Sequence, residues 1–487
     1  MSFKFSVKSV IILFISVFFF NCSTKSEDIP VDIEVQNFVW HGLNAYYLWQ
    51  GSVPDLADTR FSSQTELNAY LEGFSTPESL FDNLIYTPTD RFSWIVDDYV
   101  ALENSFQGIT LNNGMEFGLR YYSDGSTNVY GYVRYVIPGS DAEANGITRG
   151  MIFNQIDGTQ ITDTNYTTLL SSTTYTIGLA NYNSGSPIAS GATVTLTKGD
   201  LTENPILVTN VFDEGTTKIG YIMYNQFSSS FDSELNTAFS NFKAEGINDL
   251  IVDLRYNGGG SVNTATYLGS MITGQFNDEV FSKQAWNEKA MAVFDEEDLT
   301  NRFTDQIVTT DTSGNVISEE TINSLNLSRI YFIVSGSSAS ASELVINSLS
   351  SYIDVQLVGT TTVGKQVGSI TLYDSENYQR TGTNLNTNHT YAMQPIVLEI
   401  TNKDDVNYPD GIIPATTFPG VYLEEEDSNL GTLGEKSDPL LSRTITLITT
   451  GSKAIDSGKS IEQSKEVYNS KMANPSYNNM YVDFNKN

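Results

Sequence analysis

The sequence contains one cysteine, Cys22, and two histidines, His41 and His389. An intrachain disulfide needs two cysteines, and a Cys/His zinc cluster needs four such ligands, so both are excluded. The scarcity of histidine also argues against a catalytic triad built on an imidazole base. We interpret both histidines as packing or surface residues, and we expect neither a metal nor a cofactor.

Positive charge is scarce as well. The chain has 26 basic and 58 acidic side chains, a formal net charge of -32. A basic groove is difficult to build from this composition, so nucleic acid is not an expected partner. The hydrophobic content of 40% and aromatic content of 12% are enough for sizeable cores. At roughly 150 residues per domain, 487 residues suggest about three domains.

Residues 1–21 have the pattern of an export signal. Lys4 and Lys8 precede an apolar run, Val10 to Phe20, that is too short to span a membrane comfortably. Cys22 follows that run after a single residue, Asn21, which resembles the acceptor site of bacterial lipoproteins. The resemblance implies a lipid anchor on Cys22, a polar tether over 22–33, and a location in the bacterial cell envelope, on the periplasmic face or the outer surface. The alternative is a plain secretory signal with an incidental Cys22.

The rest of the chain predicts a multidomain α+β and α/β protein. Helical periodicity over 34–106 predicts a small helical domain, and short alternating strands over 107–208 predict a β-rich domain. Over 215–425, apolar strands alternate with helical stretches, which is typical of an α/β core. Residues 426–487 then form a tail with one helix-like segment, Leu440 to Thr449, and a polar end without a chemical signal.

A glycine-rich run in the β-rich domain, Val136 to Ile147, resembles the most recognisable stretch of a PDZ domain. The resemblance implies a loop whose backbone amides hold the terminal carboxylate of a peptide, and Glu116, Phe117, Gly118 and Leu119 would form it. PDZ domains bind an extended peptide by strand addition. The alternative is that these glycines only make turns and that the domain is a spacer.

Three apolar strands of the α/β core are each followed by a chemically distinctive loop. The strand over 250–254 precedes the glycine loop Asn257 to Gly260, and a helix is predicted from Val262. The strand over 329–334 precedes Ser340, and the strand over 353–358 precedes Lys365. Because parallel strands joined by right-handed crossovers have their carboxyl ends at one edge, these loops should meet there. That edge is where open α/β sheets bind ligands.

A serine at a helix start, a lysine one strand away and a glycine loop together favour nucleophilic catalysis with a lysine base. With a free pKa of about 10.4, only about one lysine in 2,500 is neutral at pH 7. The site must therefore bury Lys365 and keep carboxylates away from its amine. The amide of Ala341 and an amide of Gly258 or Gly259 are the candidates for stabilising an oxyanion.

These residues also resemble a known family. The run Ser338 to Glu343, followed by Gly364-Lys365 with Lys365 25 residues after Ser340, is similar to the C-terminal processing peptidases, or tail-specific proteases. Asp253-Leu254-Arg255 with the glycine loop, and Pro409 to Pro414, resemble further motifs of that family. The match covers about 108–422, with a PDZ domain before the core. It implies a crotonase-like core, Ser340 as nucleophile, Lys365 as general base and cleavage of exported proteins or peptides near free C-termini.

The sequence departs from the family at Ser369, where members often carry a glutamine that orients the lysine. Ser369 or Gln366 would then support Lys365, and Glu343 could tune the site. Ser338 is the alternative in the serine run and is expected to cap the helix. A second reading is a membrane-anchored peptide-binding lipoprotein that is catalytically weak or inactive, and a glycan-capturing surface lipoprotein ranks below it. Nothing in the sequence fixes the oligomeric state.

Overall fold

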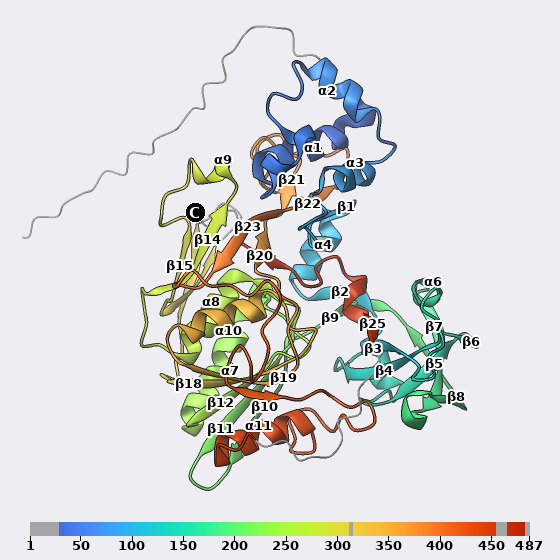
Figure 1. Cartoon of the computed structure of the whole chain (residues 1–487), viewed down its shortest axis with the longest axis vertical. Helices are drawn as coiled ribbons and strands as arrows, with labels where there is room; N and C mark the ends of the chain where they lie inside the picture. Colours follow the sequence, from blue (N-terminus) through green and yellow to red (C-terminus); the bar gives the residue numbers. More distant parts are fainter. Residues whose placement is uncertain (1–28, 311–314, 454–464, 483–487) are drawn as a thin grey trace, which may run out of the picture.

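A computed structural model describes residues 29–310, 315–453 and 465–482 (Figure 1). The predicted export signal and Cys22 lie outside the described residues. None of the helices in these three ranges combines the length and apolar character that crossing a bilayer requires.

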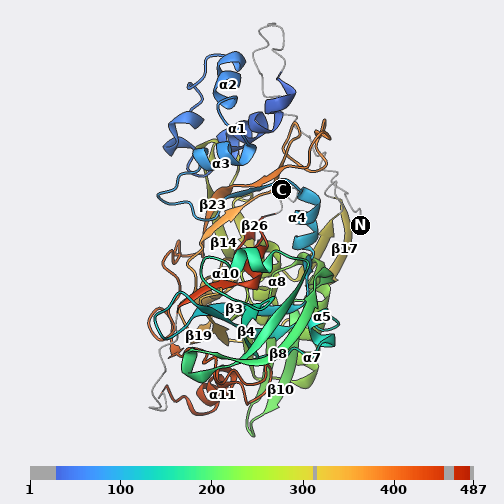
Figure 2. The same ribbon diagram turned by 90° about the vertical axis from the view of Figure 1, so that its right-hand side faces the viewer.

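The N-terminal helices are α1 (Glu34–Tyr46), α2 (Gln64–Leu71), α3 (Pro77–Leu84) and α4 (Tyr99–Phe106), with 3-10 turns at Val31–Ile33, Gln50–Ser52 and Pro54–Leu56. Helices α1, α2 and α3 lie at one end of the molecule in both views (Figures 1 and 2). Ser63, Thr76 and Asp98 cap α2, α3 and α4 by accepting first-turn N–H groups. Strand β1 (Trp94–Val96) pairs with β22 (Ala392–Gln394), which also pairs with β21 (Leu372–Tyr373). The predicted helical domain is confirmed.

The middle region, residues 109–202, is built mainly of antiparallel strands. Its sheet has the order β25-β3-β4-β5-β7-β8, with β25 (Glu466–Asn469), β3 (Met115–Tyr121), β4 (Val129–Val136), β5 (Ile152–Ile156), β7 (Thr174–Asn181) and β8 (Ile188–Thr197). Strand β6 (Thr159–Gln160) pairs with β5, and β2 (Ile109–Asn112) pairs with β9 (Gly199–Thr202). The remaining elements are α5 (Asp141–Ala144), α6 (Tyr166–Leu170) and a 3-10 turn, Asn183–Gly185. One strand of this sheet, β25, therefore comes from the C-terminal part of the chain.

The first core sheet carries the functional loops. Its order is β10 (Ile206–Asp213), β11 (Lys218–Tyr224), β12 (Asp249–Asp253), β18 (Arg329–Val334), β19 (Asp354–Gly359) and β24 (Gly420–Tyr422). Every pair from β11 to β24 is parallel, and only β10 runs antiparallel to its neighbour. Helices α7 (Asp232–Glu245), α8 (Val262–Ile272) and α10 (Ala341–Ser350) cover one face, and α11 (Pro439–Thr450) covers the other. Both faces are thus buried, as parallel sheets require.

A second core sheet packs on the far side of α8 and α10. Its order is β13 (Gly260–Ser261), β26 (Met480–Tyr481), β20 (Val367–Ser369), β23 (Ile396–Thr401), β14 (Val280–Trp286) and β15 (Thr300–Arg302). The peripheral elements are the hairpin β16 (Gln306–Thr310) and β17 (Val316–Thr321), helix α9 (Glu288–Met291), and 3-10 turns at Ser229–Phe231 and Ser470–Ala473. Because β13 directly precedes α8, this sheet reaches the glycine loop.

The segment after residue 425 is not a separate tail. Helix α11 buries Leu440, Leu441 and Ile445 against the first core sheet, β25 joins the middle region, and β26 lies inside the second core sheet. Strands of four and two residues are too short to show an alternating pattern, which is why the sequence did not reveal them. The C-terminal segment therefore connects parts of the molecule that are distant in sequence.

Arg255 fixes this segment to the end of β12. Its guanidinium is fully buried and donates to Asp253 (2.6 Å), to Asp438 (2.8 Å) and to Glu425 (2.8 Å). Asp438 also caps α11 by accepting the N–H of Leu441. Burial alone would raise the pKa of Glu425, but Arg149 and Arg255 lower it to about 2. Arg255 is therefore the centre of a buried ion-pair network.

Replacing Arg255 with methionine should lower the free energy of unfolding by about 3–5 kcal/mol, because it leaves buried carboxylates without a partner. Denaturant unfolding measures this loss. Lys283→Ala is the control, since its ion pair with Asp405 is solvent-exposed and should contribute less than about 1 kcal/mol. Equal, small losses in both variants would contradict the structural role of Arg255.

Candidate active site

Three loops meet at the carboxyl edge of the first core sheet. Strands β12, β18 and β19 are parallel neighbours, which confirms the predicted arrangement. The loops also bond to each other, since the Ala339 N–H donates to Asn257 O (3.1 Å) and the Val363 N–H donates to Ser338 O (3.0 Å). The predicted helices after the glycine loop and after Ser340 are present as α8 and α10.

Ser340 lies immediately before α10 in an unusual backbone conformation. Its φ of 66° and ψ of -117° are uncommon for a residue with a side chain. The carboxylate of Glu343 accepts the Ser340 N–H (2.8 Å) and holds this turn. The Ser340 side chain is fully buried, and its hydroxyl has no hydrogen-bond partner among the described residues. The hydroxyl proton is therefore available to a base.

Glu343 joins the serine turn to the lysine loop. Besides the Ser340 N–H, its carboxylate accepts the N–H groups of Lys365 (2.9 Å) and Gly364 (2.7 Å) and the Thr362 hydroxyl. Burial raises the pKa of Glu343 against the lowering effect of these hydrogen bonds. The carboxylate thus accepts hydrogen bonds from backbone N–H groups and a hydroxyl, while the lysine amine donates to Asn478 O.

The motif Pro409 to Pro414 supports the lysine loop from behind. The Ile412 N–H donates to the Thr362 hydroxyl (2.7 Å), and the Thr362 N–H donates to Ile412 O (3.2 Å). Gly364 has a φ of +83°, and a Cβ there would lie 2.3 Å from Pro409 O. This close approach explains why glycine precedes the lysine.

The amine of Lys365 is buried, as the proposed chemistry requires. The side chain is 2% exposed, and Nζ donates to Asn478 O (2.7 Å) and lies 4.8 Å from the centre of the Phe92 ring. Burial lowers the pKa of Lys365 to about 7, although Asp90 and Glu343 act in the opposite direction. A substantial fraction of Lys365 is therefore neutral at pH 7.

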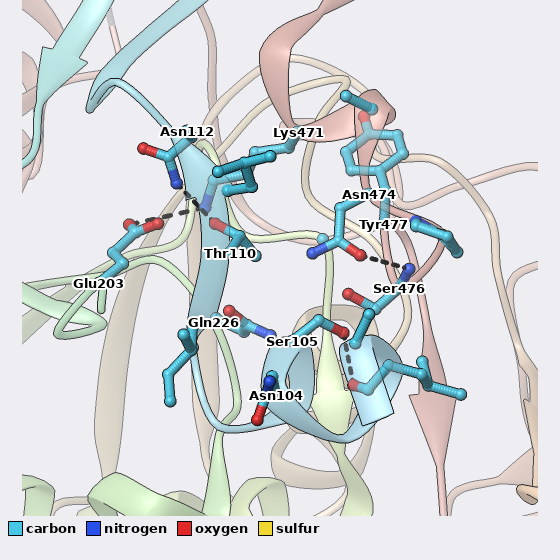
Figure 3. A pocket seen from close by; sticks show the side chains of 18 of the residues that line it. Asn104, Ser105, Thr110, Asn112, Glu203, Gln226, Lys471, Asn474, Ser476 and Tyr477 are labelled. Atoms are coloured by element: carbon cyan, nitrogen blue, oxygen red, sulfur yellow. Dashed lines mark hydrogen bonds and ion pairs between the residues drawn. The ribbon is translucent and has the colours of Figure 1, made fainter. Parts of the chain in front are cut away.

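Ser340 and Lys365 line one small cavity of about 20 Å³, enough for a single water. A larger cavity of about 450 Å³ lies next to it and is lined by Gly258 and Gly259, by α4 and β2, and by residues 473–478 (Figure 3). Glu203 and Lys471 interact at its wall, 3.8 Å apart. Since the glycine loop lines the larger cavity and packs on Ser340, there is room for a ligand on that side of Ser340.

The glycine loop leaves one of its predicted oxyanion donors unavailable. The Gly259 N–H donates to Asn257 Oδ1 (2.8 Å), while Asn257 Nδ2 donates to Tyr224 O (2.8 Å). The assignment of Gly259 as an oxyanion donor was therefore wrong. Within the described part of the chain, the N–H groups of Gly258 and Ala341 have no acceptor, and they remain the candidates.

The predicted supporting side chains do not bond to the amine. Ser369 Oγ lies 2.9 Å from Asn479 Oδ1 and 3.1 Å from Met480 O. Gln366 lines the small cavity, and no described hydrogen bond joins its side chain to Lys365. Ser338 is not the helix cap, because its hydroxyl donates to Leu254 O (2.7 Å).

Sequence reasoning missed Asn478, Phe92 and Asp90. Asn478 contacts the amine through its backbone carbonyl, a group that every residue has, so its identity gave no signal. Phe92 lies in the loop after α3, where Asp90 accepts the N–H groups of Phe92 and Ser93. The N-terminal domain therefore supplies one wall around Lys365.

Residues Glu116 to Leu119 lie in strand β3 and do not form an open loop, so that prediction was wrong. The chain's own strand β25 pairs with them, with Asn469 opposite Gly118 and Tyr468 opposite Leu119. The Phe117 N–H donates to Ser470 Oγ (2.9 Å). Burial raises the pKa of Glu116 to about 7, assisted by Glu203. This edge of the sheet is already occupied by residues 466–470.

Neither histidine is near the site. His389 Nε2 lies 3.0 Å from Asp374 Oδ2, and the His41 ring packs edge-on against Trp40. Burial lowers the pKa of His41, while the negative charge of Asp374 acts to raise it. Across the described ranges, no group of three or more His, Cys, Asp or Glu side chains is arranged to hold a metal ion.

Two family models match the chain. Residues 218–395 match peptidase family S41, and residues 34–94 match the peptidase S41 N-terminal domain. The chain belongs to peptidase family S41. The first match contains both Ser340 and Lys365, and the second contains Phe92. No curated protein matches this S41 peptidase.

Solved structures share the fold of this S41 peptidase. A Bacteroides fragilis protein, provisionally described as an S41 protease, is 21% identical with a TM-score of 0.62, covering 85% of this chain and 97% of its own. The photosystem II D1 C-terminal processing protease is 16% identical with a TM-score of 0.47, covering 86% of this chain and 97% of its own. The first likeness shows a common fold for most of the chain.

Gly259→Ala should destabilise the protein by about 3 kcal/mol or more, through backbone strain and overpacking. Gly259 has a φ of +111°, and a Cβ there would lie 2.5 Å from Asn479 O and 2.6 Å from Ser340 Cβ. Gly150→Ala is the control, since Gly150 has a φ of +84° but open space around it and should cost only about 1 kcal/mol. Thermal or denaturant unfolding compares them, and equal losses would show that the loop does not pack tightly on Ser340.

Proposed function

We propose that this S41 peptidase is a serine endopeptidase in which Ser340 is the nucleophile and Lys365 is the general base. The observation that carries the proposal is the pairing of two buried groups at one cavity, a hydroxyl without a partner and an amine whose pKa is lowered to about 7 by burial. A lysine can act as a base only when its amine is neutral, whereas the amine of an ordinary surface lysine is charged at pH 7.

In the proposed reaction, Ser340 Oγ attacks the carbonyl carbon of a peptide bond as its proton passes to Lys365 Nζ. The carbonyl π electrons move to the oxygen, giving a tetrahedral oxyanion. When that intermediate collapses, the C–N bond breaks and the Lys365 ammonium donates its proton to the leaving amine. Water then repeats the sequence on the acyl ester, with Lys365 again as the base, and releases Ser340.

The N–H groups of Gly258 and Ala341 are assigned as the donors that stabilise the oxyanion. Both are unpaired in the described structure, and Ala341 is the first residue of α10, where the helix dipole favours negative charge. The strained backbone turn at Ser340 puts the proposed nucleophile directly before the first residue of α10. Removing one such donor typically raises the barrier by about 3 kcal/mol.

The proposed substrates are exported proteins or peptides cut near free C-termini. The middle region is assigned to recognition of the substrate tail, because PDZ domains, which its sequence resembles, bind extended peptides by strand addition. The edge of β3 pairs with β25 and is not part of this assignment. Anchoring through a lipid on Cys22 would hold the peptidase at a membrane of the bacterial cell envelope.

A second candidate function is peptide binding with little or no turnover. The observation that favours it is the complete burial of Ser340 beside a cavity too small for a peptide bond. The two functions differ in whether Ser340 reacts, and a covalent probe of serine reactivity separates them.

The parent protein should be labelled by a fluorophosphonate, which forms a P–O bond to Ser340 and loses fluoride, and it should cleave unfolded casein. Ser340→Ala should abolish both reactions. Lys365→Ala should slow both by about 10²- to 10⁴-fold, the usual contribution of a general base. Lys365→Arg should do no better, because arginine cannot act as a neutral base. Mass spectrometry measures the label and the fragment ends.

Lys283→Ala serves as the control for loss of a lysine, because that side chain lies on the surface and, among the described residues, forms its ion pair with Asp405. An unlabelled parent that still binds peptides would establish the second candidate function. Near-parent rates in Lys365→Ala would show that another group is the base.

The rate of cleavage should depend on pH through Lys365. The amine is a base only when neutral, so kcat/KM should be low below pH 6, rise through a midpoint near pH 7 and level off above pH 8, following the pKa of about 7. Asp90 and Glu343 are the acidic groups that act on this pKa. Rates measured between pH 5 and 10 test this, and a rise centred near pH 10 would contradict a buried, neutral base.

A further inference from the structure

The amine of Lys365 has one described hydrogen-bond acceptor, and it comes from the far C-terminal segment. Lys365 Nζ donates to the backbone carbonyl of Asn478 across 2.7 Å. Asn478 also lines the large cavity, as do Gly258 and Gly259, so one residue contacts both that cavity and the lysine. A single residue 113 positions after Lys365 therefore contacts the proposed base.

The segment around Asn478 is built into the core. Strand β26 pairs with β13, directly after the glycine loop, and with β20, directly after Lys365. Met480 and Asn479 are buried, and Ser369 Oγ contacts Asn479 Oδ1 and Met480 O. The segment that contains Asn478 is therefore fixed by β13 and β20, the strands next to the glycine loop and to Lys365.

The backbone of Asn478, and not its side chain, makes this contact. Its φ of 54° lies in the left-handed region, which asparagine and glycine tolerate and β-branched residues do not. Its side-chain Oδ1 has no hydrogen-bond partner. The conformation of this residue sets where the carbonyl points, because φ and ψ fix the direction of the peptide plane.

The contact suits a neutral amine. A neutral lysine has two N–H groups and one lone pair, so donating one N–H to Asn478 O leaves the lone pair to accept the Ser340 proton. The ring of Phe92, 4.8 Å from Nζ, borders the amine as well. A fixed acceptor restricts rotation of the amine and of the long side chain, which lowers the entropy cost of reaching the reactive geometry.

We propose that the Asn478 carbonyl is the positioning group of Lys365, and that Ser369, which stands where related peptidases often have a glutamine, acts indirectly by holding the strand that delivers it. The inference rests on the proposed function, since it assumes that Lys365 is the base. Under this proposal, the C-terminal segment contributes a positioning group to the active site.

The test compares Asn478→Val with Asn478→Gly in the full chain. Both variants remove the same side-chain amide, but only valine disfavours the left-handed backbone that presents the carbonyl. Fluorophosphonate labelling of Ser340 should fall by about 100-fold in Asn478→Val, the usual effect of a displacement near 1 Å, and should stay within a few-fold of the parent in Asn478→Gly. Ser369→Ala should lie between them.

The pH dependence of labelling separates positioning from general damage. A carbonyl that accepts a hydrogen bond from the amine favours the ammonium form, so its loss should move the midpoint in Asn478→Val to lower pH. Asp90 and Glu343, which also act on this pKa, are unchanged in both variants. A variant that is merely less folded would lose amplitude and keep the parent midpoint, and circular dichroism measures the folded fraction.

The outcomes are distinct. Equal labelling rates and midpoints in the two Asn478 variants would overturn the positioning role. Faster labelling in Asn478→Val would also overturn it and would make the segment an inhibitory one. Retention of labelling in Ser340→Ala, or labelling of Lys365→Ala at near-parent rates, would instead overturn the proposed function itself, whatever the Asn478 variants do.

Discussion

The burial of a single amine constrains the whole structure. Lowering the pKa of Lys365 from 10.5 to about 7 corresponds to about 5 kcal/mol of lost stability for the charged form. A shift of this size requires the surrounding protein to exclude bulk water from the amine. Here the walls come from three parts of the chain: Phe92 from the N-terminal domain, the core around α10, and Asn478 from the C-terminal segment.

The carboxylates near the site are placed so that they do not cancel this effect. Glu343 is buried close to Lys365, yet it accepts the backbone N–H of that residue and leaves the amine to a neutral carbonyl. Asp90 is occupied by the N–H groups of Phe92 and Ser93 and by the Tyr47 hydroxyl. A carboxylate in direct contact with the amine would favour the ammonium ion and remove the base at neutral pH. Glu343 and Asp90 therefore stabilise the loops by accepting backbone N–H groups and do not bond to the amine of Lys365.

The parallel strands, the meeting of their loops and the approach of Ser340 to Lys365 could be predicted because they follow from local patterns and from the handedness of crossovers. The roles of Ser369 and Gly259 could not, because a side chain's hydrogen-bond partner depends on what the fold brings beside it. Asn257 takes the Gly259 amide, and Asn479 takes the Ser369 hydroxyl. Strands β25 and β26 were missed because short strands are defined by their neighbours, and these neighbours, β3 for β25 and β13 and β20 for β26, are more than 100 residues away in the sequence.

The C-terminal segment links two distant parts of the molecule, since it passes from the edge of β3 to the amine of Lys365 within the span 466–478. The central claim remains the ionisation state of that amine, and NMR observes it directly. In protein labelled with ¹³C-lysine, the Lys365 Cε resonance, assigned by its absence in Lys365→Ala, should titrate with a midpoint near pH 7. A Lys365 midpoint near 10 would show that the amine is charged at neutral pH and would contradict the account.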